Sequence, residues 1–304
     1  MTKTSALKKC VFPAVAILVA MGLVLSLGLY LWANLVRPGV GVDLLTDGAW
    51  GALDVIDGET CDIVSIQINE IEYVRSIFRH DDSIYITSVS SSNIDSPRHT
   101  GNGMFRLDTH TLAVEKINIP EFDNGVAKAV SVGGAVLVRV ATTLYTTRDL
   151  KSVDTFMENV STFAQISRET ILVEKMDGQV FWVECSPIGW TVNRSPLQLR
   201  YKDHIIGALG KVLYTHAGTI DMISMKYEDN LEDSWRTPPR IIQFDPATNT
   251  TMVASYHIGH PVFVSREGGG RRPSRIWIGP ISTMLPLTKS EAIAIRTAAA
   301  KLSK

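Results

Sequence analysis

The stretches GMFRLDTHTLAVEKI (103–117) and RIIQFDPATNTTMV (240–253) decide the fold, because they share one pattern. Each has a short apolar strand that ends in an aromatic or aliphatic residue and Asp, then a turn containing Thr, then an outgoing strand. Asp108 and Asp245 stand where the turn begins, so each carboxylate can accept hydrogen bonds from the backbone of its own turn. The sequence therefore predicts a repeated strand–turn–strand unit.

Two weaker copies lie between these stretches. TLYTTRDLKSVDTF (143–156) places Asp149 at the turn, and QVFWVECSPIGWTV (179–192) places Glu184 there. The turns follow one another at about 40 residues, which is the spacing of propeller blades. The interval before Asp245 is longer, and the charged, proline-terminated segment 226–239 is interpreted as an insertion.

From about residue 50 to 287 the chain shows short runs rich in Val, Ile, Tyr, Phe and Thr, bounded by Gly, Asn, Asp and Pro. Such runs are typical of strands, and a repeat of this length favours a β-propeller over a sandwich or a barrel. We expect five blades, with six as the alternative. The units are 73–119, 125–156, 159–194, 201–256 and a short final unit from 259, which segment 51–68 completes to close the ring.

This strand and turn pattern resembles the β-propellers of the kelch, quinoprotein and YVTN kind. The resemblance lies in the apolar–aromatic-Asp-x-x-Thr turn alone and covers roughly residues 50–287. It implies an all-β propeller architecture and no particular family, since the sequence lacks the repeated Gly-Gly doublets of kelch units, the Trp-Asp dipeptide and a full Asp-box.

The run from Cys10 to Val36 contains no Asp, Glu, Lys, Arg or His. A helix needs about 20 apolar residues to cross a bilayer, so the run predicts a transmembrane signal-anchor helix over 10–36. Residues 1–9 would then form a cytoplasmic tail and 37–49 a linker. A cleaved signal peptide is the alternative, although the run is longer than a typical secretory apolar region.

The basic residues flanking this run set its orientation. Lys3, Lys8 and Lys9 precede it and only Arg37 follows closely, so the positive-inside rule keeps the N-terminus cytoplasmic. The propeller would then lie in a periplasm, at a cell surface or in an organelle lumen. After it, residues 288–304 are Ala-rich and predict a helical tail, with Ser290 as the N-terminal cap.

Composition and the positions of the cysteines argue against nucleic-acid binding and against a disulfide bond. The net charge is −1, from 30 basic and 31 acidic residues, so no broad positive field attracts nucleic acid. Of the three cysteines, Cys61 and Cys185 lie outside the predicted anchor. The blade map separates them by a whole blade, so we expect both to stay reduced.

The search for catalytic chemistry finds no nucleophile, metal or cofactor motif, and no catalytic residue, metal ligand or cofactor is predicted. A glycan hydrolase needs two acids flanking the scissile bond. The predicted inner strands contain no Asp or Glu, although Arg75 and Lys128 would face the central channel. These strands are 73–78, 126–132, 162–166, 204–209 and 261–265. Asp81, Asp82 and Asp203 lie just outside them.

Polar loops supply the candidate binding residues. The Gly-rich connection 266–275, here called the Arg-rich loop, carries Arg266, Arg271, Arg272 and Arg275. The charged segment 226–239 contains Trp235, and the long polar loop after residue 88 contains Arg98 and His99. Each of these segments could simply be a solvent-exposed loop without a binding role. Trp and Arg are, however, the residues that dominate protein-binding hot spots.

The favoured hypothesis is a membrane-anchored, extracytoplasmic propeller that binds a protein partner as a scaffold. The alternative is an anchored glycan hydrolase or lyase with its site in the channel, in which case a glycan is the ligand. A small-ligand sensor that signals across the membrane is a third hypothesis, disfavoured because the cytoplasmic tail is short. A fold does not fix a function, so these hypotheses depend on the site.

Overall fold

A computed structural model describes residues 42–48, 51–60, 62–89, 103–186, 188–229, 241–246, 250–255, 262–266, 274–276 and 283–302. The chain divides into two compact units, 1–38 and 39–304. The first unit, with the predicted anchor over 10–36, lies outside the described residues. Within the residues that are described, no helix is both long and apolar enough to cross a membrane.

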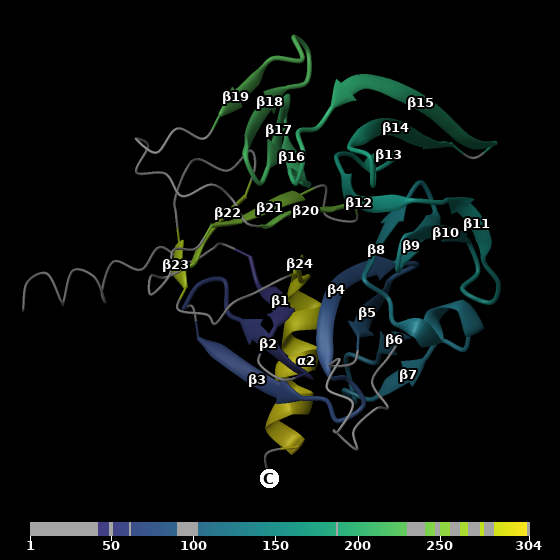
Figure 1. The fold of residues 1–304 in the computed structure, drawn as a ribbon. Helices are drawn as coiled ribbons and strands as arrows, with labels where there is room; N and C mark the ends of the chain where they lie inside the picture. Colours follow the sequence, from purple (N-terminus) through teal and green to yellow (C-terminus); the bar gives the residue numbers. More distant parts are fainter. Residues whose placement is uncertain are drawn as a thin grey trace, which may run out of the picture. The chain divides into compact units, whose positions relative to one another are not determined.

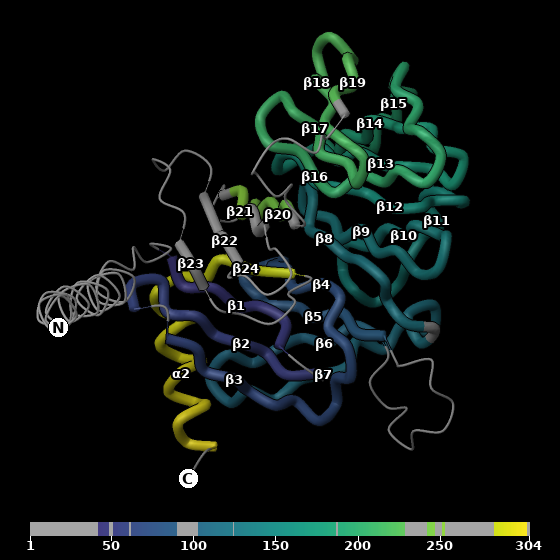
Figure 2. The backbone as a smooth tube through the Cα atoms, turned by 60° about the vertical axis from the view of Figure 1, so that its left-hand side comes forward, coloured from purple at the N-terminus to yellow at the C-terminus, as the bar shows by residue number. Residues whose placement is uncertain are grey.

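The second unit contains six four-stranded antiparallel sheets in its described part (Figures 1 and 2). The first sheet consists of β24 (Met284–Pro286), β1 (Leu44–Asp47), β2 (Ala52–Ile56) and β3 (Ile63–Gln67). The second consists of β4 (Tyr73–His80), β5 (Ser83–Val89), β6 (Gly103–Leu107) and β7 (Val114–Lys116). The third consists of β8 (Lys128–Val132), β9 (Ala135–Val140), β10 (Thr143–Thr147) and β11 (Asp154–Met157).

The other three sheets follow in chain order. The fourth consists of β12 (Val160–Gln165), β13 (Thr170–Lys175), β14 (Gln179–Ser186) and β15 (Gly189–Gln198). The fifth consists of β16 (Ile205–Leu209), β17 (Val212–Thr215), β18 (Gly218–Asp221) and β19 (Tyr227–Asp229). The sixth consists of β20 (Ile241–Asp245), β21 (Thr250–Ser255), β22 (Val262–Arg266) and β23 (Ser274–Ile276).

The strand named first in each sheet is the inner strand. β4 contacts β8, β12 contacts β16, β16 contacts β20, and β24 contacts both β20 and β4. Hydrophobic side chains fill the spaces between neighbouring sheets: Phe163 and Val160 of the fourth sheet, for example, cluster with Leu137 and Val130 of the third. Successive sheets packed face to face around a set of inner strands make a β-propeller, so the predicted all-β architecture is confirmed. The described chain has six blades, the alternative to five in the sequence-based prediction.

The two ends of the propeller meet in the first blade. β24 pairs antiparallel with β1, with Leu285 opposite Leu45, and supplies the inner strand that β1–β3 lack. The prediction that the N-terminal segment closes the ring is correct in kind. Its partner is β24, however, rather than the strands around residue 260. Predicted unit 201–256 was wrong, because its residues divide between the fifth and sixth blades.

In the described part of the chain, a 3-10 helix and an α-helix accompany the sheets. The 3-10 helix η2 (Pro120–Asn124) connects β7 to β8 and buries Phe122 completely. The helix α2 (Lys289–Leu302) packs on β2 and β3 and buries Ala292, Ile295 and Ala298.

The cap of α2 differs from the prediction. The Glu291 amide donates to Thr288 Oγ1 at 3.3 Å, and the Thr288 amide donates to Glu291 Oε2 at 2.7 Å. This reciprocal arrangement is a capping box, and it satisfies two backbone donors that a helix start leaves open. Thr288 is therefore the cap, and the assignment of Ser290 was wrong.

The Asp turn recurs in four blades. In each, one carboxylate oxygen accepts the backbone amides two and three residues further on, at the turn after the third strand; the four residues are Asp57, Asp108, Asp149 and Asp221. These backbone bonds stabilise the ionised form and lower the pKa of all four carboxyls.

The predicted turn residues are thus confirmed at Asp108 and Asp149 and wrong at the other two positions. Glu184 lies inside β14, between Thr170 and Thr191 on the adjacent strands. Asp245 ends an inner strand and has a different partner, described below.

Cys185, on β14, is buried and forms no disulfide, as predicted. Burial raises the pKa of its thiol. Cys61 lies outside the described residues, so its state stays a prediction.

Candidate functional site

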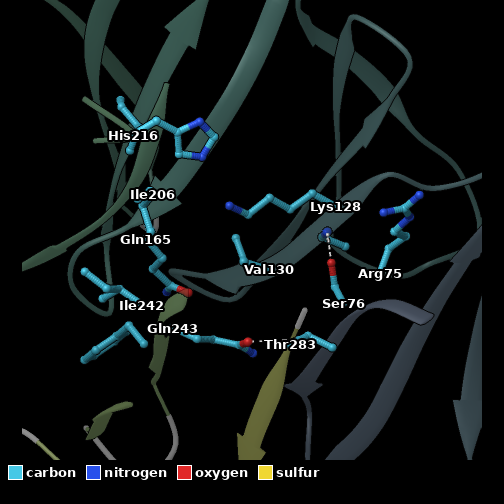
Figure 3. A pocket seen from close by; sticks show the side chains of 14 residues that line it. Arg75, Ser76, Lys128, Val130, Gln165, Ile206, His216, Ile242, Gln243 and Thr283 are labelled. Carbon is cyan, nitrogen blue, oxygen red and sulfur yellow. Dashed lines mark hydrogen bonds between the residues drawn. The ribbon is translucent and has the colours of Figure 1, made fainter. Parts of the chain in front are cut away.

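A cavity of about 190 Å³ lies where the inner strands converge (Figure 3). Residues from β4, β8, β12, β16 and β20 line it, together with Thr283 before β24 and His216 between β17 and β18. Arg75 and Lys128 are among them, so the sequence correctly placed both on the channel. In Figure 3 the Lys128 side chain extends from β8 toward the side that carries Gln165 and His216.

Arg75 lies on a β-bulge. The register between β4 and β5 shifts between Val74 and Ser76, so Arg75 is an extra residue on the inner strand. A bulge bends its strand and re-aims a side chain, and bulges are over-represented near functional sites. The Arg75 side chain is exposed although Val74 and Ser76 beside it are buried. The bulge therefore accounts for an exposed, charged side chain at the cavity between two buried neighbours.

Two other inner strands carry a shift near their starts. The register of β12 shifts between Val160 and Thr162, and that of β16 between Ile205 and Gly207. Ile206 is the extra residue on β16, and it lines the same cavity as Arg75.

The blades of Arg75 and Lys128 are joined by one buried hydrogen bond. The Ala129 amide donates to Ser76 Oγ at 3.0 Å, linking β8 to β4. Arg75 and Lys128 immediately precede these two residues. The Lys128 ammonium also lies over the Phe163 ring of the next blade, 5.3 Å from the ring centroid. A cation in this position is attracted to the ring face.

The surroundings of Lys128 are electropositive. Arg139 lies opposite it on β9. Burial and the Arg139 charge lower the pKa of Lys128 to about 8, against the opposing effect of Glu174. Burial lowers the pKa of Arg139 too, and Arg75 adds to this lowering. The Arg139 Nε atom is buried without a hydrogen-bond partner among the described residues.

Glu174 is an acid close enough to act on Lys128, but both of its carboxylate oxygens accept hydrogen bonds from other residues. Its side chain is only 1% exposed and accepts hydrogen bonds from His204 Nδ1 at 2.7 Å and from the Ile205 amide at 2.9 Å. The sequence analysis missed both Glu174 and Arg139 because they lie on second strands. The available signal was a single charge inside an apolar run, in TILVEK (170–175) and AVLVRV (135–140).

Two glutamine side chains join inner strands of different blades by hydrogen bonds. Gln165 Nε2 donates to the Ser131 carbonyl at 2.7 Å, and Gln243 Nε2 donates to the Ile77 carbonyl at 2.7 Å. Gln243 Oε1 accepts from Thr283 Oγ1 at 2.9 Å, which binds the sixth blade to the closing segment. The described lining of this cavity thus holds cations and neutral groups, with no carboxylate. Its chemistry fits anion binding and lacks the acid pair of a glycosidase.

A second cavity, of about 280 Å³, lies at the other end of β4. Its lining includes the turn residues Asp81 and Asp82, two of the three acids that lie just outside the predicted inner strands. His80 is buried between Ser131 Oγ, 3.0 Å from its Nδ1, and Asp81 Oδ2, 3.4 Å from its Nε2. The remaining predicted acid, Asp203, is buried and accepts the amides of His204 and Ala217 and the Tyr227 hydroxyl, so it is a structural residue.

A buried ion network connects the chain's C-terminal segment to two blades. Arg79 on β4 contacts Asp245 Oδ2 at 2.9 Å, Glu291 Oε2 at 2.7 Å and the Pro286 carbonyl at 3.0 Å. Arg79 and Asp245 are 6% and 1% exposed. The network therefore ties β4, β20 and the start of α2 together.

The loop residues predicted to bind a partner fall mostly outside the described residues. This holds for Arg271, Arg272, Trp235, Arg98 and His99. The backbone places Arg266 at the end of β22 and Arg275 in the adjacent β23. Among described side chains, no group of three His, Cys, Asp or Glu residues could hold a metal ion.

The fourth blade has a long outer strand that the sequence analysis did not single out. β15 has ten residues, pairs with β14 alone among the described strands, and leaves residues 191–194 exposed (Figure 1). Trp190 anchors its start against Phe156 of the third blade, with ring centroids 5.0 Å apart. Ile188, at the preceding turn, is 99% exposed, and Val192 is 44% exposed.

No protein-family model matches the sequence, and no curated protein matches it. Among solved structures, a putative 6-phosphogluconolactonase from Bacteroides uniformis is 11% identical with a TM-score of 0.48, covering 77% of this chain and 81% of that one. BamB from Moraxella catarrhalis is 13% identical with a TM-score of 0.42, covering 80% and 85%. The N-terminal domain of Nup159 is 11% identical with a TM-score of 0.44, covering 82% and 77%. The propeller assignment rests on the six sheets themselves.

Proposed function

We propose that this chain is a membrane-anchored, extracytoplasmic β-propeller that binds a protein partner and acts as a scaffold in an envelope or lumenal assembly. The observation that carries the protein-binding part is the outer edge of β15. Folded proteins protect sheet edges by keeping them short or covered, because an open edge is a template for pairing with another chain. β15 is the longest strand of the described chain and is an edge.

The chemistry of this edge suits a protein strand. Residues 191–194 are exposed, and Pro196 stops further pairing only near the end of the strand, because proline has no amide to donate. A partner strand would gain main-chain hydrogen bonds along β15 and apolar contact with Ile188 and Val192. The loop residues proposed from the sequence stay candidate partner contacts, and they include the Arg-rich loop from Arg266 to Arg275 together with Trp235, Arg98 and His99.

Copurification with mass spectrometry tests the partner. The full-length tagged protein should retain a stoichiometric protein, and the Ile188→Asp and Val192→Pro variants should lose it. Ile293→Asp is the matched control, since Ile293 is 64% exposed on α2, far along the chain from the fourth blade. A partner lost equally in the control, or no partner at all, would contradict the proposal. If the partner is lost only in the double variant Arg271→Ala/Arg272→Ala, the partner binds the Arg-rich loop rather than β15.

The anchor has an independent test. It rests on the uncharged run from Cys10 to Val36 and on the preceding lysines. Full-length protein should stay with membranes after alkaline carbonate extraction, whereas Leu23→Arg/Leu27→Arg should be released, because charges at a helix centre oppose insertion. Full-length protein in the soluble fraction would contradict the anchor without touching the protein-binding proposal.

A further inference from the structure

The central cavity carries two cations without a counter-charge. Arg75 and Lys128 line it, and neither forms an ion pair with any carboxylate of the described chain. Elsewhere the same part of the chain pairs its buried charge closely, as Arg79 does with Asp245 and Glu291. The described residues thus supply no carboxylate partner for the two cations at the cavity.

The charges around the cavity leave a positive excess. Arg139 opposes the protonation of Lys128, and Arg75 opposes that of Arg139; among the described residues, Glu174 is the acid that favours the charged form of both Lys128 and Arg139. Both oxygens of Glu174 already accept hydrogen bonds, from His204 and Ile205. Like charges confined between apolar walls repel strongly, so an added anion would relieve this repulsion.

Size and donors define the ligand class. A cavity of about 190 Å³ has room for a small anion. Lysine brings three donors and arginine five. Ser76 Oγ already accepts from the Ala129 amide, which leaves its own proton free to donate. The rest of the lining combines apolar side chains, such as Val130, Ile206 and Ile242, with the neutral polar groups of Gln165, Gln243 and Thr283.

We propose that the central cavity binds a small oxyanion of the carboxylate or phosphate class, held by Arg75 and Lys128 with Ser76 as a neutral donor. The bulge at Arg75 positions one cation, and the Ser76–Ala129 hydrogen bond holds the strand of the other beside it. This site is distinct from the β15 edge and goes beyond the protein-binding function.

Isothermal titration calorimetry of the full-length protein tests the site, with inorganic phosphate in one series and acetate in another at constant ionic strength. Saturable binding is expected in at least one series, and the series that binds identifies the phosphate or the carboxylate class. Arg75→Met and Lys128→Met should each weaken it at least about tenfold, because each removes a charge-assisted hydrogen bond. The controls Arg106→Met and Lys211→Met remove exposed cations away from the cavity and should change the affinity less than about twofold.

Thermal unfolding verifies that each variant folds. If Lys128→Met does not fold, Arg75→Met still tests the proposal. The Arg75 side chain is exposed, so its replacement leaves no buried gap. Absence of saturable binding for both anions overturns the proposal. Equal affinity in Arg75→Met and in the wild type also overturns it, because the anion would then bind elsewhere, for instance on the Arg-rich loop.

Discussion

Ser76 Oγ on β4 accepts the amide proton of Ala129 on β8 at 3.0 Å, and this buried bond crosses from one blade to the next. Each of the two residues follows a cation, Arg75 in one strand and Lys128 in the other. The pairing of cations at the cavity is thus a product of blade packing, since neither strand alone brings the second charge. The consequences of that arrangement can be measured as stability and as binding.

Lys128→Met should stabilise the fold at neutral pH. The pKa of Lys128 is lowered from 10.5 to about 8, so keeping it charged in the fold costs free energy below pH 8. Between pH 8 and 10.5 the unfolded chain binds more protons at this site than the fold, so wild-type stability rises with pH there. Urea unfolding should show Lys128→Met more stable by about 2 kcal/mol at pH 7, with the difference shrinking toward zero at pH 10.

The stability difference between variant and wild type isolates Lys128, because the buried Cys185 thiol, whose pKa is raised from 9.0, is the same in both proteins. Tyr227 has a pKa raised to about 12, chiefly by burial and its hydrogen bond to Asp203, so its stabilising effect declines only above pH 10. Arg75 and His216 line the same cavity and are unchanged in the variant, and Lys211→Met serves as the surface control. A stability difference that is constant from pH 7 to 10 would show that Lys128 stays charged throughout.

The Arg79–Asp245 pair should behave as a buried unit. Arg79→Met should lower the free energy of unfolding by about 3–5 kcal/mol, because it removes the buried cation that Asp245 and Glu291 share. Asp245→Leu should cost less, because Arg79 keeps its contact with Glu291. The double variant should cost clearly less than the sum, as measured in a double-mutant cycle. Lys116→Met, which breaks the exposed pair with Asp123, should cost at most about 1 kcal/mol. Strict additivity of the two buried substitutions would rule out coupling.

The adjacent glycines Gly133 and Gly134 offer a matched comparison in the β8–β9 turn. Both have positive φ, 55° and 76°, so alanine is strained at either position. A Cβ at Gly133 would also lie 2.6 Å from the Cβ and Sγ atoms of Cys185, whereas one at Gly134 meets nothing within 4 Å. Gly134→Ala should cost about 1 kcal/mol in chemical denaturation, and Gly133→Ala at least about 1 kcal/mol more. Equal costs would mean that the two hairpins are not packed together there.

Closure of the ring should depend on the last 22 residues. Removal of residues 283–304 deletes β24, the inner strand of the first blade, and α2 with its apolar face. It also removes Glu291, a partner of Arg79. The truncated chain should lose cooperative thermal unfolding as followed by circular dichroism. A cooperative transition at the wild-type temperature would show that the other strands form a stable ring unaided.

The sequence was sufficient for the architecture because its two main signals are local. Alternation and β-branched residues mark strands, and an Asp that accepts its own turn's amides is visible in six residues. Asp108 and Asp149 were therefore identified correctly. Asp221 was missed because its turn, DMISMK, lacks the Asp-x-x-Thr spacing of Asp108 and Asp245, although it makes the same two backbone hydrogen bonds as Asp108.

The errors arose where the answer depends on distant residues. RIIQFD resembles the Asp-turn units in sequence, but Asp245 ends an inner strand and faces Arg79, 166 positions away in the chain. Assigning it to a turn merged the fifth and sixth blades. Only part of the cavity's surroundings could be predicted from the sequence. Strand alternation predicts that Arg75 and Lys128 face the channel. Arg139 and Glu174 lie near it only because the second strands β9 and β13 pair with β8 and β12.

Site-specific photocrosslinking in cells tests the central claim, partner binding along β15, most directly. A photoreactive amino acid at Val192 should yield one discrete crosslinked protein, identified by mass spectrometry. The same residue at Thr155, an exposed position on the outer strand β11 of the third blade, should yield none. No adduct at Val192, or the same adducts at both positions, would contradict partner binding through β15.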